Sequence, residues 1–127
     1  MPFNYTVEPE NRLLCMLGSG QVSMEDRYVC VDQILSDQSI DENLNILIDV
    51  CQVANCPSPG DISSIIALVE RLKSRFMGRV AIVNATAGHV TITNFISFGA
   101  ERGGNSVRSF YSDSEARKWL CSEMPPG

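Results

Sequence analysis

The stretch that decides the fold is NILIDVCQVANCPSPGDISSII, residues 45–66. A strand is predicted over residues 44–50, because the segment is mostly apolar and its two faces differ. One face carries Leu44, Ile46, Ile48 and Val50, and the other carries Asn45, Leu47 and Asp49. After a proline-rich turn, a helix is predicted whose apolar stripe holds Ile62, Ile65, Val69, Leu72 and Phe76. A strand followed by a crossover helix indicates an α/β fold with parallel strands.

The turn between them, SPGD at residues 58–61, has the residues of a helix start. Ser58 suits the N-cap, Pro59 suits the first helical position, and the Asp61 carboxylate can reach back to the Ser58 amide. Asp61 also favours the positive end of the helix dipole. Because an N-cap serine contributes about 1 kcal/mol of stability, Ser58 is explained without any function.

The N-terminal part predicts a hairpin and a helix. Residues 4–9 and 12–20 have strand patterns, and the short link between them indicates that these strands are antiparallel. Ser23 then opens a helix, and its apolar face carries Met24, Tyr28, Val31 and Leu35. Residues 38–43 form a polar loop. The segment RVAIVNA, residues 79–85, is nearly all apolar, as is typical of a strand buried in a parallel sheet.

The C-terminal part contains one ambiguous segment, residues 87–104. Its VTIT run is typical of a strand. However, the spacing of Ile92, Phe95, Ile96 and Gly99 is typical of one face of a helix. We predict a helix there, because a parallel crossover is needed. Residues 105–111 predict the last strand and residues 112–120 the last helix, in which Ser112 and Glu115 have capping-box spacing.

The predicted fold is therefore α/β, with a mixed five-stranded sheet in the order β-β-α-β-α-β-α-β-α. An antiparallel hairpin comes first and parallel strands follow, with most helices on the richer face of the sheet. The length of 127 residues fits one domain over residues 1–127.

Composition narrows the function classes. The net charge is -5 and the pI is near 4.7, so the protein surface is acidic. An acidic surface repels phosphate backbones, and nucleic acid is therefore not an expected partner. The five cysteines are an odd number and the N-terminus has no signal-peptide pattern, which favours reduced thiols in the cytoplasm. No apolar run approaches the ~20 residues that a transmembrane helix needs.

The residues Cys51, Cys56 and His89 could form two kinds of chemical site. The cysteine spacing is not that of a C-x-x-C motif, and a metal would need a fourth ligand, so no metal or cofactor is expected. Either cysteine could pair with His89 as nucleophile and base at the carboxyl edge of the sheet. No third orienting residue and no oxyanion-hole motif is visible, however, and we predict that the protein is not an enzyme.

The strand ILIDVCQV entering a Pro-Ser-Pro-Gly turn, together with the closing segment SFYSDSEARKWL, resembles STAS-like domains. These have the anti-sigma-factor antagonist fold. They include uncharacterised single-domain bacterial proteins likened to Sec14-type (CRAL-TRIO) lipid-binding modules. The resemblance covers nearly the whole chain.

In the antagonists, this turn carries a serine that a partner kinase phosphorylates. The positions that match their motif are Asp49, Val53, Ser58 and Gly60. Pro57 and Pro59 replace the residues on either side of the serine, and Asn55 replaces an apolar position. Because Asp61 already occupies the helix dipole and proline flanks Ser58, we predict that Ser58 is not a phosphorylation site.

The resemblance implies a non-catalytic regulatory or protein-interaction module whose partner is a kinase or another sigma-pathway protein. Its contact residues would be Asp49, Ser58, Gly60, Asp61 and Ile62. The alternative is a binding module for a lipid or another apolar small ligand, with contacts from Ile92, Phe95 and Ile96. The oligomeric state is left open, a dimer included.

Overall fold

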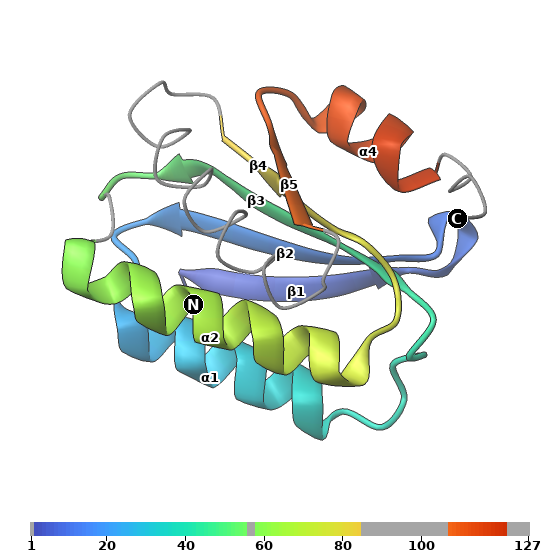
Figure 1. The fold of residues 1–127 in the computed structure, drawn as a ribbon, viewed down its shortest axis with the longest axis horizontal. Helices are drawn as coiled ribbons and strands as arrows, with labels where there is room; N and C mark the ends of the chain where they lie inside the picture. Colours follow the sequence, from blue (N-terminus) through green and yellow to red (C-terminus); the bar gives the residue numbers. More distant parts are fainter. Residues whose placement is uncertain (1, 56–57, 85–106, 122–127) are drawn as a thin grey trace.

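In the described residues, five strands form one mixed sheet with helices on both of its faces (Figure 1). The computed structural model describes residues 2–55, 58–84 and 107–121. Across the sheet lie, in order, β1 (Phe3–Glu8), β2 (Leu13–Gly20), β3 (Asn45–Val53), β4 (Val80–Val83) and β5 (Val107–Phe110). β1 pairs antiparallel with β2, and every following pair is parallel. The predicted mixed sheet with an N-terminal hairpin is confirmed.

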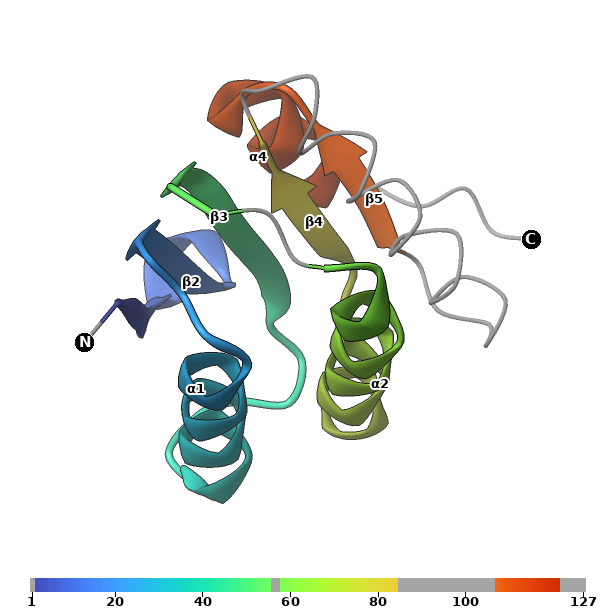
Figure 2. The ribbon, with the colours of Figure 1, turned by 90° about the vertical axis from the view of Figure 1, so that its left-hand side faces the viewer.

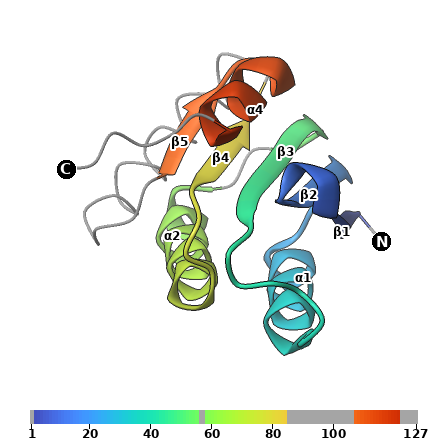
Figure 3. The same ribbon diagram turned by 90° about the vertical axis from the view of Figure 1, so that its right-hand side faces the viewer.

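The helices divide between the two faces of the sheet. They are α1 (Met24–Ser36), α2 (Pro59–Arg75) and α4 (Asp113–Cys121), with a short 3-10 turn, η1 (Pro9–Asn11), in the first hairpin. α1 and α2 lie side by side on one face, and α4 lies on the other (Figure 2). The reverse view shows α1 below β2 and α2 below β4 (Figure 3). Within the described part of the chain, no helix is long and apolar enough to cross a bilayer.

Each face of the sheet has its own core, and β3 contributes to both. The larger core, between the sheet and the helices α1 and α2, includes Leu14, Ile34, Leu44, Ile46, Ile48, Leu72 and Phe76. The smaller core, below α4, is made of Leu13, Leu47, Ala81, Val83, Ala116 and Leu120. The predicted apolar alternation of the central strand is confirmed, since Ile46 and Ile48 enter the larger core and Leu47 enters the smaller one.

β3 is longer than the sequence pattern predicted. It ends at Val53 rather than at Val50, because β2 extends to Gly20 and pairs with it to the end. The Ala54 amide then donates to the Gly20 carbonyl oxygen at 2.7 Å. The helix predicted over residues 87–104 lies outside the described residues.

α4 is joined to the far edge of the sheet by an ion pair. Arg117 on α4 donates from Nη1 and Nη2 to the two carboxylate oxygens of Glu8 at the end of β1, at 3.1 Å each. The pKa of Glu8 is lowered from 4.5 to about 2, first by this hydrogen bonding to Arg117 and then by hydrogen bonds from Cys15 and Asn11. The charged form of Glu8 therefore stabilises the folded state.

This pair predicts a pH dependence of stability. The pKa of Glu8 is lower in the folded protein than in the unfolded chain. The contribution of Glu8 to the free energy of unfolding is therefore complete when the pH is above the pKa of the unfolded chain, and it is lost as the pH falls towards about 2. We expect the free energy of unfolding to differ between wild type and Glu8→Gln by a constant amount above about pH 5, and by less at each lower pH. Urea unfolding across a pH series measures this difference, and a difference that stays constant down to about pH 3 would contradict the assignment.

Candidate partner-binding site

The predicted contact residues lie where β2 and β3 end and α1 and α2 begin, at the left of Figure 1. In parallel α/β sheets, binding sites gather at the carboxyl ends of the strands. Two links cross this edge: residues 21–23 lead from β2 into α1, and residues 54–58 lead from β3 into α2. The structure describes the first link completely and the second at residues 54, 55 and 58.

The two links are tied together by the side chain of Asn55. Its Oδ1 accepts a hydrogen bond from the Val22 amide at 2.8 Å, and its Nδ2 donates to the Val22 carbonyl oxygen at 2.9 Å. Val22 is 1% exposed, so both backbone groups would otherwise be shielded from water. The neighbouring Gly20 has φ 66°, a left-handed conformation that favours glycine. The Asn55 side chain therefore joins the residues that follow β3 to the residues that follow β2.

The start of α2 presents Ser58 and Gly60 at the surface. Ser58 is the N-cap, and its amide donates to Asp61 Oδ2 at 3.3 Å, which confirms the predicted reach-back of Asp61. The Asp61 amide donates in turn to the Ser58 carbonyl oxygen at 2.9 Å. Among the described residues, a Cβ on Gly60 would meet only the Ser58 Oγ, at 3.9 Å, so these residues leave the space beside Gly60 open.

The start of α1 has the same capping chemistry. The Ser23 Oγ accepts from the Asp26 amide at 3.1 Å, and Asp26 Oδ2 accepts from the Ser23 amide at 2.9 Å. The hydrogen bond from the Ser23 backbone is the main cause that lowers the pKa of Asp26. Burial lowers the pKa of Arg27, while the negative charges of Asp61 and Asp26 raise it. Both helix starts thus carry carboxylates, and the Arg27 guanidinium lies near them.

Asp49 and Ile62 belong to the frame below this surface. The register between β2 and β3 shifts after Asp49, and the Cys51 amide in the shifted stretch donates to Asp49 Oδ1 at 2.9 Å. Such a side-chain contact stabilises an irregular strand end. Ile62 is partly buried against the larger core. Of the predicted contact residues, the structure therefore brings Ser58, Gly60 and Asp61 together at the start of α2, whereas Asp49 lies within β3 and Ile62 packs against the larger core.

The residues of the alternative hypotheses are only partly described. Ile92, Phe95 and Ile96, predicted to contact an apolar ligand, lie outside the described residues, as do Cys56 and His89. Cys51 is half-buried in β3. Among residues 2–55, 58–84 and 107–121, no three His, Cys, Asp or Glu side chains converge as metal ligands would.

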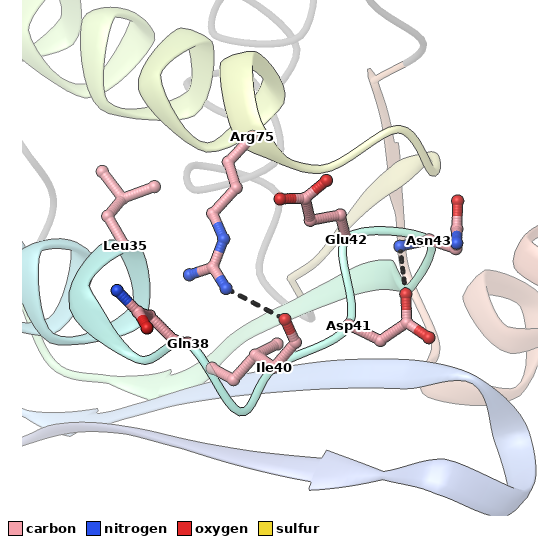
Figure 4. A pocket seen from close by; sticks show the side chains of 7 residues that line it. All are labelled: Leu35, Gln38, Ile40, Asp41, Glu42, Asn43 and Arg75. Atoms are coloured by element: carbon pink, nitrogen blue, oxygen red, sulfur yellow. Dashed lines mark hydrogen bonds between the residues drawn. The ribbon is translucent and has the colours of Figure 1, made fainter.

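A hollow of about 500 Å³ opens at the opposite end of the domain, beside the last residues of α1 and α2 (Figure 4). Its wall is the loop at residues 38–43, with Leu35 and Arg75. The Arg75 guanidinium donates to the carbonyl oxygens of Ile34, Asp37 and Ile40, at 2.5, 2.8 and 2.9 Å. These bonds satisfy carbonyls of the last turn of α1 and of the residues that follow it, so Arg75 joins the loop to α2. The wall is mostly polar, which does not suit a lipid tail.

Sequence reasoning missed the role of Asn55. It treated the residue only as a polar substitution at an apolar position of the antagonist motif. The available signal was the residue type: a primary amide can both accept and donate, so an asparagine between a strand and a helix can bind both backbone groups of one residue. The partner, Val22, is distant in the sequence and could not be identified.

The Asn55 bridge predicts a loss of stability on truncation. Asn55→Ala leaves the Val22 amide without its partner and the Val22 carbonyl with the longer bond from Arg27 Nη1 at 3.4 Å, and we expect the free energy of unfolding to fall by about 1–3 kcal/mol. Asn43→Ala, at an exposed position in the loop after α1, is the matched control and should change it by less than about 0.5 kcal/mol. Urea unfolding of the three proteins measures both effects. Equal stabilities for the two variants would contradict the bridge.

Comparison with solved structures supports the fold. The chain resembles the crystal structure of an uncharacterized DUF3478-family protein with a SpoIIAA-like fold from Shewanella loihica PV-4. The TM-score is 0.65 and the identity 18%, over 94% of this chain and 92% of that chain. The chain matches no protein-family model and no curated protein sequence. At this identity the likeness establishes the fold alone: the domain has the SpoIIAA-like, STAS-like architecture that the sequence predicted.

Proposed function

We infer that the domain is a non-catalytic protein-interaction module, and that its partner binds the turn formed by Ser58, Gly60 and Asp61. The observation that carries this proposal is the exposed start of α2 at the carboxyl edge of the sheet, where Ser58 and Gly60 lie at the surface. The Asn55 side chain joins the two links across this edge through Val22, and among the described residues only the Ser58 Oγ would lie near a Cβ on Gly60. Binding sites of parallel α/β sheets gather at this edge.

The described polar groups at this edge support a non-catalytic role. The Asp61 carboxylate accepts from the Ser58 amide, and the Asp49 carboxylate accepts from the Cys51 amide. The side-chain amide of Asn55 is hydrogen-bonded to the backbone amide and carbonyl of Val22. Each group is thus engaged with the backbone, whereas nucleophilic catalysis needs a nucleophile within hydrogen-bond reach of a base.

Ser58 is proposed to act as a helix cap rather than as a phosphorylated switch. The Asp61 carboxylate already accepts a hydrogen bond from the Ser58 amide, so a phosphate on Ser58 would lie near it. Both groups are negatively charged and would repel each other. We expect the intact mass of the protein from its native cell to lack a phosphorylated species. A stoichiometric species heavier by about 80 Da, absent from Ser58→Ala, would show that Ser58 is phosphorylated.

The contact surface is tested by a bulky substitution that the fold can accept. Gly60→Arg places a long side chain in the open space at the turn, while Met77→Arg adds the same charge beyond the other end of α2, where Met77 is 80% exposed. We expect a partner protein to co-purify from native cells with wild type and with Met77→Arg, and to be reduced at least about tenfold with Gly60→Arg.

Circular dichroism and urea unfolding of each variant control for folding. Equal recovery of the partner with both variants would contradict the assigned surface. A bound lipid with no partner protein, seen by native mass spectrometry of the purified wild type, would instead support the apolar-ligand alternative.

A further inference from the structure

β1 is the outermost strand of the sheet, on the side away from β5 (Figure 3). Among the described residues, β1 pairs with β2 and with no other strand. The backbone N–H and C=O groups on its outer side therefore need either water or a further strand as a partner. An exposed edge of this kind is a template to which another extended chain can pair.

The hydrogen-bond pattern determines which backbone groups of β1 face outward. In an antiparallel ladder, residue pairs that exchange hydrogen bonds alternate with pairs that do not. The Ser19 amide donates to the Pro2 carbonyl oxygen at 2.9 Å, and this pair continues the register of β1 and β2. Counting from it, the residues whose backbone groups face β2 are Asn4, Thr6 and Glu8. The residues whose amide and carbonyl groups face away from β2, called the outward groups below, are Phe3, Tyr5 and Val7.

This edge lacks the features by which proteins usually keep edge strands apart, which are proline, lysine and β-bulges. The strand Phe3–Glu8 contains neither proline nor lysine, and its register with β2 runs without a shift. Its one charged side chain, Glu8, is bonded to Arg117 on α4 by two hydrogen bonds of 3.1 Å. The outer side of β1 is therefore open to pairing with a further strand.

We propose that β1 pairs antiparallel with β1 of a second copy of this chain, so that two five-stranded sheets join into one continuous sheet. A strand that pairs antiparallel with its own copy obeys a two-fold axis, as the commonest protein dimers do. The axis passes beside Tyr5, whose amide and carbonyl exchange hydrogen bonds with Tyr5 of the second copy. Phe3 exchanges them with Val7 of the second copy, and Val7 with Phe3 of the second copy. Each outward group then has a partner.

The neighbouring registers leave outward groups unpaired. Moving the second strand by two residues in one direction places Phe3 opposite Pro9, which has no amide hydrogen to donate. Moving it by two residues in the other direction places Val7 beyond the start of the second β1. The register centred on Tyr5 therefore forms the most hydrogen bonds, which is why this edge fits its own copy.

The side chains of this register avoid the repulsion expected of an acidic protein. Asn4 of one copy lies opposite Thr6 of the other, and both side chains are exposed and uncharged. Glu8 lies opposite Pro2, so the two Glu8 residues are six positions apart along the strands, about 20 Å. This separation exceeds the Debye length of about 8 Å at physiological salt. The one charged residue of the strand therefore meets no like charge from β1 of the other copy.

The mass in solution tests whether a second copy binds. Sedimentation equilibrium of the purified protein, from about 1 µM to about 500 µM, should give a mass that rises from 14.0 kDa towards twice that value. A mass of 14.0 kDa at every concentration would overturn the proposal, whatever other strand this edge accepts.

Val7→Pro tests the backbone pairing. The Val7 amide faces outward, so proline removes an outward donor and leaves the bonds to β2 in place, as edge strands tolerate. We expect the dissociation constant of the dimer to rise at least about tenfold. Val7→Ala keeps the amide and is the matched control, which should change the constant by less than about threefold. Circular dichroism and urea unfolding show whether each variant is folded. Equal weakening by both variants, or wild-type dimerisation of folded Val7→Pro, would overturn the proposal.

Hydrogen exchange of the wild type tests the register without any substitution. Labelling of dilute and concentrated protein, read residue by residue by mass spectrometry with fragmentation, separates the outward amides of β1 from those that face β2. We expect the outward amides to exchange at least about tenfold more slowly at about 500 µM than at about 1 µM, while the amides that face β2 keep their rates. Outward amides that exchange equally fast at both concentrations would rule out pairing through β1, even if the mass doubles.

Discussion

The burial of β3 on both of its faces is the constraint around which the domain is built. Ile46 and Ile48 enter the larger core, while Leu47 enters the smaller one. A strand with two apolar faces is stable only when both sides of the sheet are covered, which requires helices on each. α1 and α2 cover one side and α4 covers the other, so the sheet becomes the middle layer (Figure 2).

The same strand sets the position of the candidate contact surface. At the carboxyl end of β3 the register of its pairing with β2 shifts. Within this stretch the Asp49 carboxylate accepts a hydrogen bond from the Cys51 amide. Asn55 then fixes the outgoing chain against Val22 before Ser58 caps α2. Each of these contacts is between a side chain and the backbone. The described residues on both sides of this edge are therefore positioned by contacts between side chains and the backbone.

Periodicity allowed most of this fold to be predicted. The alternation in β3 and the helix start at Ser58 are local patterns, because side-chain direction and capping depend on neighbouring residues. The Asn55–Val22 and Glu8–Arg117 contacts join residues far apart in the chain. Their partners follow from strand order and helix placement, which a single sequence does not specify at the level of individual atoms. The sequence therefore identified the helix cap at Ser58, but it did not identify Asn55 as the residue that bonds to Val22.

A photo-crosslinking amino acid introduced at position 58 in the native cell gives the most direct test of the central claim, that the start of α2 at Ser58, Gly60 and Asp61 is the surface a partner protein touches. The account predicts a covalent adduct with one protein species from position 58 and none from Met77, which is exposed beyond the other end of α2. The same adduct from both positions, or an adduct with a lipid alone from position 58, would contradict it.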